Sequence, residues 1–204
     1  MSPAITFFDL EIDPTSKKIA DLGFITSDLA QYHGTSIEKL LTQFGRSQFI
    51  AGHNILLHDL NYLSRLYPHI DFKQARYIDT LFLSPLLFPS KPYHRLLKDD
   101  KISDNAPNNP LNDSIKARDL FYDELASFQT LDPEMQQIFY HLLANDYRFK
   151  HFFNFMGFQP DSHIDLLTLI RHRYQNRICH NSPLESIIVA EPIELAYALA
   201  LIGA

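Results

Sequence analysis

An apolar stretch near the start of the chain runs directly into two acids. Residues 4–8 (AITFF) are β-branched and aromatic, which is typical of a buried strand, and Asp9-Leu10-Glu11 follows without a break. Because side chains alternate along a strand, Asp9 and Glu11 are expected on the same face. A fold built on this strand must therefore bring two carboxylates together where a core strand ends.

Strand-like and helical patterns alternate up to about residue 130, and only helical patterns follow Thr130. The expected further strands are 18–25 and 48–51. The expected helices are 36–44 (with Ser36 as N-cap), 59–66 and a helix that starts at Asn112 or Asp113 and runs to about Phe128. Later helices are expected at 133–145, 147–156 and 164–176, and the polar segment 99–112 is expected to be a loop. The pattern predicts an α/β core over residues 1–130 and a helical extension over 131–204 that packs on the core.

Composition narrows the class of protein. The chain has 204 residues, which fits one large domain or a domain with an extension, and its single cysteine, Cys179, suits a reducing compartment. With 18 basic against 24 acidic residues, there is no general basic coat for nucleic acid. No apolar stretch reaches the ~18 residues of a membrane span, and no basic region of a signal peptide begins the sequence. These features predict a soluble, cytoplasmic protein without a membrane partner.

Two further acids stand at expected helix starts. Asp59 follows Gly52-His53-Asn54, and Asp113 lies in the first turn of the helix expected after residue 112. An isolated Asp at such a place is usually an N-cap, and Asp79 in YIDTL is interpreted in that way. Several carboxylates brought together repel one another unless cations hold them, and such oxygen-rich clusters select Mg²⁺ or Mn²⁺. Two such ions can clamp an in-line phosphoryl displacement.

The ordered combination of these segments resembles a known superfamily. FFDLE, FIAGHNILLHDLNYL and NDSIKARDLF, with the IDTL segment between the second and third, resemble the three motifs of the DEDD (DnaQ-like) 3′–5′ exonucleases, over roughly residues 4–128. The resemblance implies a ribonuclease H-like mixed sheet with helices on both sides. It also implies two-metal-ion hydrolysis of phosphodiester bonds in nucleic acid, with DNA favoured over RNA as substrate.

The resemblance also assigns roles to individual residues. The metal-binding and catalytic acids would be Asp9, Glu11, Asp59 and Asp113, holding two Mg²⁺ or Mn²⁺ ions. The substrate-binding residues would be Leu10, Ile12, Asn54 and His58, with Leu10 and Ile12 near the terminal nucleotide and Asn54 bracing the first strand or the substrate backbone. Asp113 is preferred over Asp119 because DSIKARDLF matches the register of the family motif, which places Asp119 on the solvated part of the helix.

The chain departs from the superfamily at the general base. Members usually carry His five residues before the last Asp, or Tyr four before it, and here those positions are Asn108 and Asn109. An amide cannot accept a proton near neutral pH. The base would then be His94, His58 or neither, with the metal ions alone activating water. The alternative function is a catalytically impaired nuclease fold that binds nucleic acid or a partner domain.

The sequence ends in an apolar stretch over residues 194–204 (ELAYALALIGA). Such a segment is expected to need a partner surface. It suggests an N-terminal piece of a longer protein, in an arrangement that resembles exonuclease domains joined to DNA helicases of the RecQ type.

Overall fold

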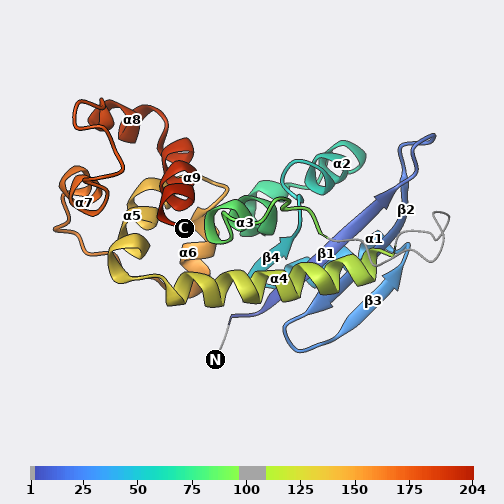
Figure 1. Ribbon diagram of the computed structural model, residues 1–204. Coiled ribbons are helices and arrows are strands. Elements are labelled where there is room, and N and C mark those ends of the chain that lie inside the picture. Colours follow the sequence, from blue (N-terminus) through green and yellow to red (C-terminus); the bar gives the residue numbers. More distant parts are fainter. Residues whose placement is uncertain (1–2, 97–108) are drawn as a thin grey trace. The chain divides into compact units, whose positions relative to one another are not determined.

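In the part of the chain that the structure describes, five strands form one mixed sheet in the order β3-β2-β1-β4-β5 (Figure 1). The computed structural model describes residues 3–96 and 109–204, and its strands are β1 (Ile5–Ile12), β2 (Ile19–Thr26), β3 (Gln31–Gly34), β4 (Phe49–Gly52) and β5 (Tyr77–Asp79). Strand β2 runs antiparallel to β1 and β3, whereas β4 is parallel to both β1 and β5. The α/β class predicted from the sequence is confirmed, although the short strands β3 and β5 were not expected.

Helices from the same part of the chain cover both faces of this sheet. Helices α1 (Ile37–Arg46) and α2 (Asp59–Leu66) contribute Leu40 and Leu63 to the buried cluster around Phe8. On the other face, Phe121 of α4 (Pro110–Thr130) lies against Phe7, with ring centroids 5.5 Å apart. Since alternate residues of β1 face opposite ways, the residues in step with Phe7, which include Asp9 and Glu11, lie on the face that α4 covers.

The described residues fall into two compact units. The first comprises residues 3–81, 94–96 and 109–123, and the second comprises residues 82–93 and 124–204. The first contains the sheet, α1, α2 and the short 3-10 helix η1 (Phe72–Gln74), and helix α3 (Thr80–Leu87) begins at its end. Helix α4 passes from the first unit into the second between residues 123 and 124. The helices that lie wholly in the second unit are α5 (Pro133–Leu143), α6 (Lys150–Met156), α7 (Leu166–Arg173), α8 (Leu184–Ala190) and α9 (Pro192–Gly203).

The second unit has an aromatic core of its own. The ring of Phe128 lies 5.7 Å from the rings of Phe152, Phe153 and Phe158. The buried hydroxyl of Tyr174 donates to the carbonyl oxygen of Leu199 at 2.9 Å. The helical character expected after Thr130 is confirmed, because the described chain beyond that residue forms helices and their connections.

The helices give no simple membrane segment. No single helix in residues 3–96 and 109–204 is both long and apolar enough to cross a membrane. Helices α8 and α9 meet the length and composition criterion only when taken together, and they are bent by 120° at their junction.

Candidate metal centre

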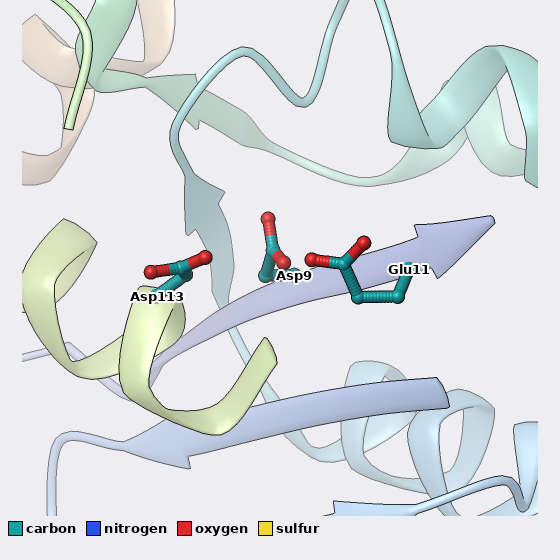
Figure 2. A group of neighbouring side chains, drawn as sticks. All are labelled: Asp9, Glu11 and Asp113. Atoms are coloured by element: carbon teal, nitrogen blue, oxygen red, sulfur yellow. The ribbon is translucent and has the colours of Figure 1, made fainter. Parts of the chain in front are cut away.

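Three carboxylates converge above the sheet. Asp9 and Glu11 project from β1 and Asp113 from the first turn of α4, and each has an oxygen within 4.8 Å of an oxygen of the others (Figure 2). All three side chains are half-buried. A divalent cation with ligand distances near 2.0–2.6 Å would span oxygens about 4–5 Å apart, so this donor set fits Mg²⁺, Mn²⁺ or Ca²⁺.

The surroundings of Asp9 disfavour the ionised form of its carboxyl group. Burial, followed by the charges of Asp59, Asp113 and Glu11, raises the pKa of Asp9 well above its ordinary value. Among the described residues, no hydrogen bond contributes to lowering the pKa of Asp9. Without a cation the protonated form of Asp9 is therefore favoured, and a bound cation would favour the ionised form.

Gly23 allows α4 to reach the sheet at this point. Gly23 of β2 is paired with Asp9 of β1, and a Cβ atom placed on Gly23 would lie 2.2 Å from the backbone nitrogen of Leu111. The Ser114 hydroxyl also donates to the carbonyl oxygen of Gly23 at 2.9 Å. A glycine within a strand pattern indicates such a close backbone approach, so Gly23 is the signal in the sequence for this contact. The missing side chain is what lets Asp113 stand beside Asp9.

Asn109 has a structural task at the start of α4. Its side-chain oxygen accepts hydrogen bonds from the backbone N–H groups of Leu111 and Asn112, at 3.0 and 3.2 Å. With Pro110 as the first helical residue, this is the usual N-cap arrangement. One of the two amides in the register of the expected base therefore holds the helix that carries Asp113. The other, Asn108, lies outside the described residues.

Asp59 is close enough for its charge to act on Asp9, and its own carboxylate is hydrogen-bonded within the protein. It is almost fully buried, one oxygen accepts the N–H of Leu10 at 2.9 Å, and the other lies 3.3 Å from Nδ1 of His58. Burial is the largest cause that raises the pKa of Asp59, and its charge raises the pKa of Asp9 in turn. Asp59 is thus an electrostatic neighbour of the cluster, and its role as a metal ligand stays a prediction.

The expected substrate residues on β1 lie at or near the core. The side chain of Leu10 is 3% exposed and belongs to the cluster around Phe8, and Ile12 packs against the same cluster. The contribution of Leu10 that the structure shows is its backbone N–H, which binds Asp59. Asp119 is 62% exposed and bonded to Arg118, in agreement with the expectation that it is solvated.

Asp79 holds the turn that precedes Asp59. Its carboxylate accepts the backbone N–H groups of Asn54 at 2.7 Å, Leu56 at 3.0 Å and Leu81 at 3.0 Å. The last bond is the helix cap expected from the sequence, and the first two fix a turn in which Asn54 has a left-handed φ of 64°. Burial raises the pKa of Asp79 to about 6 although these bonds lower it. Asp79 is therefore a positioning residue that sequence reasoning recognised only as a cap.

Replacing Asp79 by Asn should loosen this turn. The amide would turn an N–H₂ group toward one or two backbone donors, and the loss should be about 1–3 kcal/mol of the free energy of unfolding, measured by urea denaturation. Mn²⁺ affinity, measured by calorimetry, should also fall because Asp59 follows the turn. Asp165→Asn, at a cap in α7 that bonds only within its own helix start, should leave Mn²⁺ affinity unchanged. Unchanged Mn²⁺ affinity in Asp79→Asn would show that Asp79 contributes to the stability of the fold but does not position the metal site.

The two candidate histidines occupy different surroundings. His58 is 44% exposed in its side chain, and its hydrogen bond with Asp59 is the main cause that raises its pKa. His94 is half-buried near His53, whose pKa is lowered to about 4 by burial and by the charge of His94. His53 is held by Thr80, with Nδ1 2.8 Å from the hydroxyl oxygen. The assignment of the general base to His94 or His58 stays a prediction.

Comparison with known proteins adds no relative. No family model matches the chain, no curated protein matches it, and no solved structure matches it. The chemistry of the acidic cluster is therefore the basis for a functional proposal.

Proposed function

We propose that this chain is a metal-dependent 3′–5′ exonuclease of the DEDD type, with a ribonuclease H-like sheet, that acts on DNA. The observation that carries the proposal is the convergence of Asp9, Glu11 and Asp113 within 4.8 Å, with Asp59 close enough to raise the pKa of Asp9. The sheet order, with β2 antiparallel next to a central β1, supports the same class. A protein that only gripped phosphate would gain nothing from clustered negative charge.

The residues of the chain would divide the work as follows. Asp9, Glu11 and Asp113 would hold Mg²⁺ or Mn²⁺, with Asp59 completing the set. When bound, two such ions supply charge neutralisation for the phosphodiester and lower the pKa of the attacking water. Asp59 also braces β1 through the N–H of Leu10, and Asp79 braces the turn that contains Asn54, so both acids keep the ligands in place.

A nuclease assay on end-labelled DNA tests the proposal. With Mn²⁺ present, a 3′-labelled oligonucleotide should release labelled mononucleotide at once, and a 5′-labelled one should shorten as a ladder. EDTA should stop both. If the DNA stays intact under all metal conditions while Mn²⁺ binding is retained, the result would favour the alternative, a catalytically impaired nuclease fold that binds nucleic acid or a partner domain. The use of Asn109 as a helix cap supports this alternative.

The hypothesis that His94 is the general base predicts a kinetic defect in His94→Ala. Loss of a general base should lower turnover by about 10²–10⁴-fold, while Mn²⁺ affinity stays at the wild-type value. His163→Ala, at an exposed site in the second unit, serves as the matched control and should leave turnover unchanged. Equal turnover in His94→Ala and wild type would end the role of His94, and His58→Ala would be the next variant.

A further inference from the structure

Lys116 is a cation in contact with the acidic cluster. It lies one turn after Asp113 on α4, and its Nζ is 3.7 Å from Oδ1 of Asp113, with the two side chains 25% and 26% exposed. In an ordinary surface setting such an i,i+3 pair contributes little to stability. Here its acidic partner also stands within 4.8 Å of Asp9 and Glu11, so the ammonium lies in a concentrated negative potential.

The bound cations and Lys116 would compete for the same carboxylate. In the metal-free protein, the ammonium offsets part of the repulsion among the three acids. A divalent cation on Asp113 would neutralise that partner and repel the ammonium at short range. The flexible four-carbon stem of lysine lets Nζ move away while α4 stays fixed.

We propose that Lys116 exchanges Asp113 for a phosphate of the nucleic-acid substrate when divalent cations occupy the cluster. This inference rests on the proposed function, because it requires cations on Asp113 and a phosphodiester beside them. It assigns two roles to Lys116 that neither the sequence motifs nor the acidic cluster specifies. Lys116 would offset negative charge in the metal-free cluster, and it would contact a substrate phosphate when the cations are bound.

The proposal predicts opposite effects of Lys116→Met on two affinities. Removing the ammonium leaves the cluster more negative, so Mn²⁺ should bind up to about fivefold more tightly. The same change removes a phosphate contact, so single-stranded DNA should bind more weakly, and the slope of log affinity against log salt should be less steep by about 0.7. A purely structural role in α4 would lower both affinities together.

The experiment uses the full chain and two titrations. Mn²⁺ binding to metal-free protein is measured by calorimetry, and binding of a fluorescent single-stranded DNA is measured by anisotropy with Ca²⁺ in place of Mn²⁺, after a gel has shown that the DNA is intact. Lys116→Arg should keep both wild-type affinities. Arg118→Met is the matched control, because it removes a positive charge from the same helix where the partner is Asp119.

The outcomes separate the inference from the proposed function. Tighter Mn²⁺ and weaker DNA binding in Lys116→Met, without the same pair of changes in Arg118→Met, supports the exchange. The inference is overturned if Lys116→Met matches Arg118→Met in both titrations, or if it loses affinity for both Mn²⁺ and DNA. In either case the proposed function still stands, provided that the wild-type protein binds Mn²⁺ and DNA. A wild-type protein that binds no Mn²⁺ overturns both.

Discussion

Replacing Asp9 by Asn is expected to abolish metal-dependent cleavage and, at the same time, to stabilise the metal-free protein. Asn keeps the shape of the side chain and removes the charge that the cations need, so turnover should fall by at least about 10²–10³-fold. The ionised carboxylate of Asp9 is opposed by burial and by three acids, so its removal relieves repulsion in the folded state. The melting temperature in EDTA at neutral pH should therefore rise above the wild-type value.

The pH dependence of stability gives a second readout of the same variant. A carboxyl whose pKa is raised in the folded state stabilises the fold when protonated, and this contribution is lost as the pH rises through the folded pKa. Metal-free wild type should therefore be less stable at pH 8 than at pH 5 in urea denaturation. Asp9→Asn should reduce this difference without abolishing it, because Asp59 and Asp79 also have raised pKa values.

Added Mn²⁺ provides the control for this prediction. The ion should restore much of the wild-type stability at pH 8 and should have a smaller effect on Asp9→Asn, because binding to the folded state alone stabilises it. Wild-type turnover in Asp9→Asn would show that metal-dependent cleavage does not need the Asp9 carboxylate. A lower melting temperature in EDTA would show that the charge of Asp9 does not destabilise the metal-free fold.

Gly23→Ala is expected to have the largest effect on the fold of the site. Its new Cβ would lie 2.2 Å from the backbone nitrogen of Leu111, so β2 and the start of α4 must separate. Overpacking of this kind costs about 1–3 kcal/mol of the free energy of unfolding, measured by urea denaturation. Since Asp113 lies in the first turn of α4, Mn²⁺ affinity should be lost along with the close approach.

Gly45→Ala is the matched control for this variant. Gly45 lies within α1, and a Cβ atom there would have no neighbour within 4 Å. The substitution should raise the free energy of unfolding by about 0.5–1 kcal/mol, because glycine within a helix is unfavourable. Gly23→Ala with wild-type stability and Mn²⁺ affinity would mean that α4 does not depend on this contact.

Local pattern was enough for the elements that hold the acids. Side-chain alternation along β1 placed Asp9 and Glu11 on one face, and the helix expected over 59–66 is α2 with the same bounds. Ser36 caps α1 as predicted, accepting the N–H of Lys39. These features depend on residues a few positions apart, so their causes can be read from a short window of sequence.

The geometry of the site depended on contacts between distant residues. Ser114 binds Gly23 across 91 positions, Leu10 binds Asp59 across 49, and Asn54 binds Asp79 across 25. The polar strand β3 is likewise a strand because it pairs with β2. No local pattern encodes these partners, because a buried carboxylate or a strand edge takes whichever donor the folded chain brings to it. The sequence alone determined which acids the chain offers and on which elements they stand, whereas the tertiary structure decided which of them meet.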